Sequence, residues 1–201
     1  MPEFTVPPHI KGLIFDIDGT LADTMPAHYR ACLKVAKRYN FEFPLDYFIK
    51  MAGIPTKDVF RDLLKIQHIT TLSIDVVSAL KEQYYLEEIP TIKPIAFTMD
   101  IVKRYAGVLP MSMGTGGTKE IAIPNIEIIQ AGKYIPILVS AEDVSQYKPF
   151  PDTFLECARR MGIEPQHCLV FEDAINGFKA AAAAGMEWID VNQYHTPNYT
   201  F

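Results

Sequence analysis

The sequence predicts an α/β fold of three layers, in which helices cover both faces of a parallel sheet and a helical domain is inserted into this core. Five short apolar runs have the length of buried parallel strands, and they lie at 10–15, 108–113, 135–140, 168–171 and 188–191. Helix-like segments separate the last four runs, at 118–131, 151–162 and 174–185. This alternation of strand and helix is typical of a parallel sheet with helices on both faces.

The segment after the first predicted strand has a different pattern. It shows no strong strand signal, and four helical patterns follow one another at 25–40, 44–51, 56–67 and 73–88. The first contains an apolar stripe at helical spacing, formed by His28, Cys32, Val35, Ala36 and Tyr39. We therefore expect a four-helix cap domain at 24–90 that covers the carboxyl ends of the strands, and a core domain formed by 1–23 and 91–201.

The later segments carry residues that usually begin and end helices. Pro151, Asp152 and Asp173 stand at predicted helix starts. Gly162 and Gly185 stand at predicted helix ends, where glycine is common. These residues support short, sharply bounded helices between the strands of the core.

The composition excludes several classes of protein. Of the 201 residues, 49% are apolar and 21% are charged, which is ordinary for a globular chain and unlike a disordered or fibrous one. The net charge of −5 disfavours general binding to nucleic acid, and no apolar run is long enough to span a membrane. The three cysteines are widely spaced, and the N-terminus lacks the apolar stretch of a signal peptide. We expect a cytoplasmic protein that binds neither nucleic acid nor membranes.

Two carboxylates follow the first predicted strand. Asp16 and Asp18 are two residues apart, so in an extended chain they point to the same side. Paired carboxylates repel each other and therefore favour a bound cation. Gly19 permits a sharp turn after them. Taken alone, the same residues also fit a loop with an Asx turn at Asp18.

Three further groups lie near the ends of other predicted strands. Glu172 and Asp173 directly follow one strand, although Asp173 also fits a plain helix cap. The stretch 113–118 is rich in glycine and threonine before a helix, which fits an anion site or simply a tight turn. Lys148 is followed by Pro149 and Pro151, which restrict the backbone, although a lone lysine is usually a solvated charge. Together these groups supply the chemistry of Mg²⁺-assisted phosphoryl transfer through a carboxylate nucleophile.

This order of motifs resembles the haloacid dehalogenase superfamily of phosphohydrolases, and most of all its β-phosphoglucomutase-like and fructose-1-phosphatase-like branch. The matching residues are 15–21, Asp23, Thr24, His28, 53–56, 148–154, 171–177 and 184–185. The resemblance covers nearly the whole chain. It implies a Rossmann-like core with an inserted helical cap of the C1 type, and a Mg²⁺-dependent phosphoric monoester hydrolase.

The resemblance also implies a role for each motif residue. Asp16 is expected to be the nucleophile and Asp18 the general acid and base. The residues expected to bind phosphate are Thr115, Gly116 and Lys148. The expected Mg²⁺ ligands are Asp16, the backbone carbonyl of Asp18 and Asp173, with Glu172 close by. Three cap residues are expected to face the substrate, namely His28, Thr56 and Lys57, although His28 also fits the apolar stripe of its helix.

Several alternative functions remain at this point. A sugar phosphomutase needs a second phosphate site, for which related mutases use a cap-loop Arg and a Ser-Lys pair. Here Thr56 takes the cap-loop position and Lys119 is shifted by one residue, which leaves Lys57 and Lys119 as the candidates to substitute. A dehalogenase, a non-catalytic binding protein and a phospho-accepting signalling domain fit the motifs less well. We expect a monomeric phosphatase that acts on a small phosphorylated metabolite, such as a sugar phosphate esterified at C1.

Overall fold

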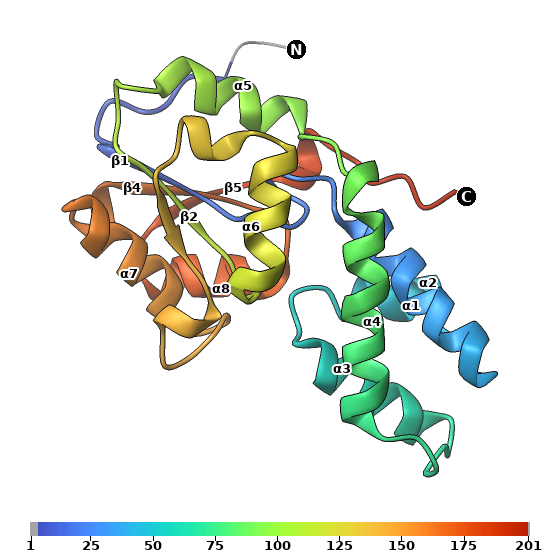
Figure 1. Cartoon of the computed structure of the whole chain (residues 1–201). Coiled ribbons are helices and arrows are strands. Elements are labelled where there is room, and N and C mark those ends of the chain that lie inside the picture. The colour runs from blue at the N-terminus through green and yellow to red at the C-terminus, as the bar shows by residue number, and fades with distance from the viewer. Residues whose placement is uncertain (1–3, 201) are drawn as a thin grey trace.

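The computed structural model describes residues 4–200 and confirms the α/β fold (Figure 1). Its strands are β1 (Gly12–Phe15), β2 (Met111–Gly114), β3 (Ile137–Val139), β4 (Cys168–Glu172) and β5 (Glu187–Asp190). Its α-helices are α1 (Met25–Tyr39), α2 (Leu45–Lys50), α3 (Thr56–Ile66), α4 (Ile74–Glu88), α5 (Ala96–Tyr105), α6 (Lys119–Ile128), α7 (Asp152–Met161) and α8 (Ile175–Ala183). Residues 1–3 and 201, which the predicted core domain includes, lie outside the described residues.

The five strands form one parallel sheet in the order β3-β2-β1-β4-β5. Because β1 is central, the residues that follow it lie beside those that follow β2 and β4. Phe15, the last residue of β1, is in register with Met113 of β2 and Phe171 of β4. The loops after these three strands therefore meet at one edge of the sheet, where α/β proteins usually bind ligands.

Alternate residues of each strand pack on opposite faces of the sheet. Leu13 and Phe15 belong to one buried cluster with α5 and α6, and Phe15 stacks on Phe171 at a centroid distance of 4.7 Å. Ile14 and Val170 belong to a second cluster, which is formed with α7 and α8. Since both faces are covered, every residue of the central strands β1, β2 and β4 is buried, whereas no residue of the edge strand β5 is.

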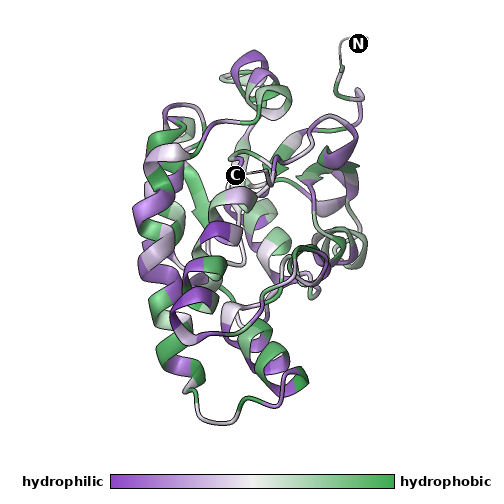
Figure 2. Ribbon diagram, turned by 90° about the vertical axis from the view of Figure 1, so that its right-hand side faces the viewer, coloured by the Kyte–Doolittle hydropathy of each residue, from purple (hydrophilic) through white to green (hydrophobic). Residues whose placement is uncertain are grey.

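The inserted segment contains α1 to α4, which share a third buried cluster (Figure 1). Val35 of α1, Phe60 of α3 and Val77 of α4 are fully buried in it. Figure 2 shows that these helices carry both hydrophobic and hydrophilic residues, as amphipathic helices do. The helical insert is thus confirmed as part of the fold, whereas the limits of the two domains stay predictions.

The sequence did not predict α5, and it placed some strand ends wrongly. Thr98, Met99, Ile101 and Val102 are buried at helical spacing, so the apolar signal of α5 is present but short. The run at 108–113 begins in a turn, and β2 begins only after Pro110. Similarly, the run at 135–140 contains Pro136, and β3 begins directly after it. In both runs a proline limits the strand because it cannot donate a ladder hydrogen bond.

Asp143 ties the loop after β3 to two helices. It accepts hydrogen bonds from the backbone and hydroxyl of Ser140 at 2.9 and 2.7 Å, from Arg160 of α7 at 2.9 Å and from Lys119 of α6 at 3.1 Å. These donors, Arg160 first, hold the pKa of Asp143 well below its ordinary value. A carboxyl group whose pKa falls on folding stabilises the folded state only where it is ionised.

We expect Asp143→Asn to lower the free energy of unfolding by about 1–2 kcal/mol at pH 7. The difference from the wild type should narrow as the pH falls below about 4, because the unfolded wild-type carboxyl then takes up a proton. Urea unfolding at pH 7 and at pH 3 measures both values. Asp75→Asn is the matched control, since the ion pair of Asp75 with Lys57 is exposed and should contribute little. If Asp143→Asn lowers the free energy of unfolding as much at pH 3 as at pH 7, the ionised carboxylate of Asp143 is not the source of the stabilisation.

Candidate active site

One cavity of about 1020 Å³ lies at the carboxyl edge of the sheet, between the core and the inserted helices. All ten residues that the sequence singled out line it, and these are Asp16, Asp18, His28, Thr56, Lys57, Thr115, Gly116, Lys148, Glu172 and Asp173. They come from the end of β4 and the loops after β1, β2 and β4, from the loop before α7, and from α1 and α3. The structure therefore brings together residues that are far apart in the sequence.

Asp16 lies directly after β1 and is paired with a buried lysine. Its backbone N–H donates to the carbonyl of Phe171 at 3.0 Å, which fixes it beside β4. Its Oδ1 accepts a hydrogen bond from Lys148 Nζ at 2.5 Å. The same ammonium donates to Glu172 Oε1 at 2.8 Å and to the carbonyl of Gly114 at 3.2 Å. Lys148 is therefore a buried structural cation of the site rather than a solvated surface charge.

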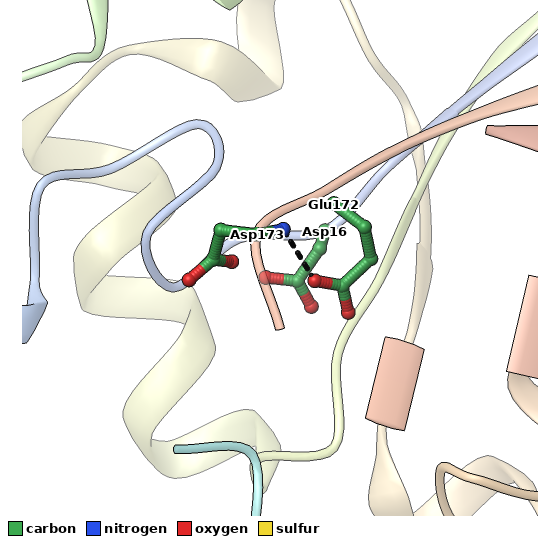
Figure 3. Close-up of side chains that lie close together, drawn as sticks. All are labelled: Asp16, Glu172 and Asp173. Atoms are coloured by element: carbon green, nitrogen blue, oxygen red, sulfur yellow. Dashed lines mark hydrogen bonds between the residues drawn. The ribbon is translucent and has the colours of Figure 1, made fainter. Parts of the chain in front are cut away.

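Asp16, Glu172 and Asp173 form an acidic cluster (Figure 3). One carboxylate oxygen of each lies within 4.8 Å of the others. Burial raises the pKa of Asp16 and of Asp173 well above the ordinary value, and repulsion from Glu172 adds to the effect, although Lys148 opposes it. The ammonium of Lys148 contacts Asp16 and Glu172 but not Asp173, and all of the available donors of the cluster are oxygens. This donor set fits a bound Mg²⁺ ion.

Two glycines make room for this cluster. Glu172 Oε2 accepts hydrogen bonds from the backbone N–H of Asp173 at 2.6 Å and of Ala174 at 2.8 Å, which holds the side chain against the start of α8. A Cβ on Gly177, one turn into α8, would overlap the Glu172 carboxylate. Gly19 has a φ of +82°, and a Cβ there would overlap the Asp173 carboxylate.

The side chain of Asp18 lies outside the acidic cluster. Its Oδ1 is 3.3 Å from Asn125 Nδ2, which donates to it, and 3.5 Å from His28 Nε2. Burial alone would raise the pKa of Asp18, but the contact with His28 and the charge of Lys81 lower it instead. The carboxylates of Asp16 and Asp18 therefore have different surroundings although they are only two residues apart.

Thr115 and Gly116 follow β2 and face the same cavity. The hydroxyl oxygen of Thr115, which is almost fully buried, accepts a hydrogen bond from the backbone N–H of Gly117 at 2.9 Å. Because that bond uses a lone pair, the hydroxyl hydrogen remains available to donate into the cavity. A Cβ on Gly116 would meet no atom within 4 Å, so its backbone is open to a ligand.

The three cap residues that the sequence proposed reach the cavity in different ways. His28 stacks on Tyr85 at a centroid distance of 3.8 Å, and its Nδ1 is 2.9 Å from Lys81 Nζ. Thr56 donates to Glu82 at 2.8 Å. Lys57 forms an exposed ion pair with Asp75 at 2.6 Å. His28 is thus the one of the three that contacts a predicted catalytic residue, namely Asp18.

Sequence reasoning missed Lys81, Tyr85 and Asn125, all of which are buried near Asp18. Lys81 stands one helical turn from both Val77 and Tyr85, so a charged residue occupies the apolar face of α4. Asn125 likewise occupies the apolar face of α6, beside Ile121 and Ile126 on that face. A polar side chain inside an apolar helical stripe is the signal that could have found both.

A parallel sheet with carboxylates, a lysine and an open glycine turn at its carboxyl edge is typical of α/β enzymes. The family model of haloacid dehalogenase-like hydrolases matches residues 13–191. The chain therefore belongs to this family, and it is a phosphoric monoester hydrolase. Within residues 4–200, none of the helices has both the length and the apolar character to cross a membrane.

Two curated relatives agree with this assignment, and a solved structure agrees with the fold. Fructose-1-phosphate phosphatase YqaB of Escherichia coli is 36% identical over 180 residues, which cover 90% of this chain and 95% of that one. Hexitol phosphatase A of the same species is 32% identical over 197 residues, which cover 90% of this chain and 83% of that one. The crystal structure of β-phosphoglucomutase from Clostridium difficile matches 90% of this chain and 84% of that one, with a TM-score of 0.79 and 22% identity. The family thus includes relatives named as phosphatases of sugar and polyol phosphates.

Proposed function

We propose that the protein is a Mg²⁺-dependent phosphatase of small sugar or polyol phosphates, and that it acts through an aspartyl-phosphate intermediate. The observation that carries the proposal is the different setting of two neighbouring carboxylates. Asp16 lies within the cluster of Lys148, Glu172 and Asp173, whereas Asp18 lies against His28 and Asn125. Two carboxylates in different surroundings suit different roles in one reaction.

In the first step, a carboxylate oxygen of Asp16 attacks phosphorus and the bond between phosphorus and the ester oxygen breaks. The departing oxygen takes a proton from Asp18 and leaves as the alcohol. A dianionic phosphate beside Asp18 would raise its pKa, which favours the protonated form that this step needs. Lys148 and the Thr115 hydroxyl would neutralise and orient the phosphoryl oxygens.

In the second step, water gives a proton to Asp18 and attacks the phosphorus of the aspartyl-phosphate. The bond between phosphorus and the Asp16 oxygen breaks, which releases inorganic phosphate and restores the carboxylate. Asp16, Asp173 and the backbone carbonyl of Asp18 would hold Mg²⁺, with Glu172 beside them. When bound, the ion would offset the negative charge of the phosphate and carboxylates.

The mutase alternative needs a cation that binds a second phosphate. Lys57 and Lys119 are the two candidates that the sequence offers for this role. Lys57 is paired with Asp75 at 2.6 Å, and Lys119 is paired with Asp143 at 3.1 Å. Lys57 therefore already has a carboxylate partner, and Lys119 is not among the residues that line the cavity. A mutase must hold both phosphates of a bisphosphate intermediate, so the lack of a free cation for the second phosphate among these two lysines favours a phosphatase.

A panel of phosphate esters tests the proposal. The wild type should release phosphate from fructose 1-phosphate or a hexitol phosphate when Mg²⁺ is present, and chelation by EDTA should remove this activity until Mg²⁺ is restored. Phosphorus NMR of the same reactions, with β-glucose 1-phosphate included, detects any isomeric sugar phosphate. An isomer that forms faster than inorganic phosphate would establish the mutase instead.

A further inference from the structure

We propose that Asn125 positions the acid–base carboxylate of Asp18, and that Tyr85 holds Asn125 in place. This inference rests on the proposed function, because it takes Asp18 to be the group that exchanges a proton with the leaving alcohol. Asn125 lies in α6 of the core and Tyr85 lies in α4 of the insert. Both residues are fully buried, with 0% of their surface exposed.

The three side chains form a continuous chain of hydrogen bonds. The Tyr85 hydroxyl donates to Asn125 Oδ1 at 2.9 Å, and Asn125 Nδ2 donates to Asp18 Oδ1 at 3.3 Å. An ionised carboxylate only accepts hydrogen bonds, so Asp18 requires the amide nitrogen of Asn125 to face it. The amide oxygen then faces the tyrosine hydroxyl, which can donate. The hydroxyl of Tyr85 therefore fixes which end of the amide Asp18 meets.

Packing alone does not explain a buried asparagine at this position. Asn125 occupies the apolar face of α6 with Ile121, Ala122 and Ile126. An apolar residue of similar size would fill the space without the desolvation cost of an amide, which is about 1–3 kcal/mol when its groups are unpaired. Here both ends of the amide are paired, and one of those partners is Asp18.

Tyr85 supports both neighbours of the same carboxylate oxygen. His28 lies flat on the Tyr85 ring, at a centroid distance of 3.8 Å and an interplanar angle of 6°. Its Nε2 is 3.5 Å from Asp18 Oδ1, the oxygen that also receives Asn125 Nδ2. These two contacts on Oδ1 orient the carboxyl group of Asp18. Oδ2, which neither of them uses, is then the oxygen that exchanges the proton with the leaving alcohol.

Substrates with different leaving groups distinguish a role of Asn125 in positioning Asp18 from a role in folding alone. A sugar alkoxide is a poor leaving group and needs a proton from Asp18, whereas nitrophenolate leaves without one. The value of kcat/KM reports the steps up to departure of the leaving group. We therefore expect Asn125→Leu to lower kcat/KM about 10–100-fold for fructose 1-phosphate, but to leave kcat/KM for p-nitrophenyl phosphate within about 3-fold of the wild type. The Asp18→Asn variant shows the largest expected loss of kcat/KM for fructose 1-phosphate relative to p-nitrophenyl phosphate, and it serves as the reference for Asn125→Leu.

The double variant Asn125→Leu with Tyr85→Phe controls for folding. The single change leaves the Tyr85 hydroxyl buried without a partner, whereas the double change removes both polar groups and should recover thermal stability. We expect the double variant to melt near the wild type and to keep the selective loss on fructose 1-phosphate. Equal losses on the two esters would overturn the proposal, as would full recovery of fructose 1-phosphate hydrolysis in the double variant. Failure of the proposed function is a different result, because the wild type would then hydrolyse neither ester with Mg²⁺.

Discussion

Asp16→Asn is expected to abolish Mg²⁺-dependent hydrolysis of every phosphate ester that the wild type accepts, with a loss of at least about 10⁴-fold in kcat. Asparagine has nearly the same shape as aspartate, but its amide is a poor nucleophile and carries no charge to pair with Lys148. The position of the side chain between β1 and Lys148 should survive the change. The expected loss therefore measures the chemistry of Asp16 and not its packing.

The same variant should fold at least as stably as the wild type when EDTA is present. Burial and neighbouring carboxylates raise the pKa of Asp16, so its charged form is disfavoured in the folded state. Removing that charge relieves the repulsion from Glu172 and Asp173, while Lys148 keeps Glu172 as a partner. Thermal melts in EDTA test this expectation. A variant that melts well below the wild type would contradict it.

Acid-quenched mass spectrometry completes the test of Asp16. Wild-type protein mixed with substrate should carry a phosphoryl group that Asp16→Asn does not acquire. Asp100→Asn is the matched control, because Asp100 is an exposed aspartate of α5, outside the cavity. It should retain wild-type rates and the same phosphorylated species. Hydrolysis by Asp16→Asn at the wild-type rate would exclude Asp16 as the nucleophile.

The sequence predicted the core and the insert well because each depends on a local pattern. Buried parallel strands are short apolar runs, and the amphipathic cap helices show helical periodicity over a turn or more. The convergence of Asp16, Thr115 and Asp173 was also predictable, since residues after parallel strands meet at one edge. By contrast, the sequence analysis did not predict α5, although its four buried positions lie at helical spacing.

Local sequence pattern does not predict that Tyr85 and Asn125 lie beside Asp18. Tyr85 and Asn125 are 40 residues apart, and they meet because α4 of the insert returns to the core beside α6. Their contact depends on how two helices lie against each other, which the periodicity of either helix does not determine. The sequence shows that polar residues interrupt the apolar faces of α4 and α6, but it does not show which side chains they bind.

Gly177→Ala is expected to destabilise the protein and reduce its activity, although alanine normally stabilises a helix. Gly177 lies within α8, where replacement of glycine by alanine usually contributes about 1 kcal/mol to stability. Here the added Cβ would overlap the Glu172 carboxylate, which is nearly fully buried and bound to Lys148. Overpacking of such a site costs about 1–3 kcal/mol, so the unfavourable effect should prevail.

Displacement of Glu172 by the added methyl group should also displace Asp16, the proposed nucleophile. The reason is that the ammonium group of Lys148 contacts both carboxylates. A shift of about 1 Å in catalytic groups can cost roughly 100-fold in rate, and we expect a loss in kcat of at least about 10-fold. Urea unfolding and phosphate release measure the two effects. In a Glu172→Ala background the obstacle is gone, so Gly177→Ala should then be neutral or stabilising. If Gly177→Ala costs the same stability in both backgrounds, the overlap with Glu172 is not the cause.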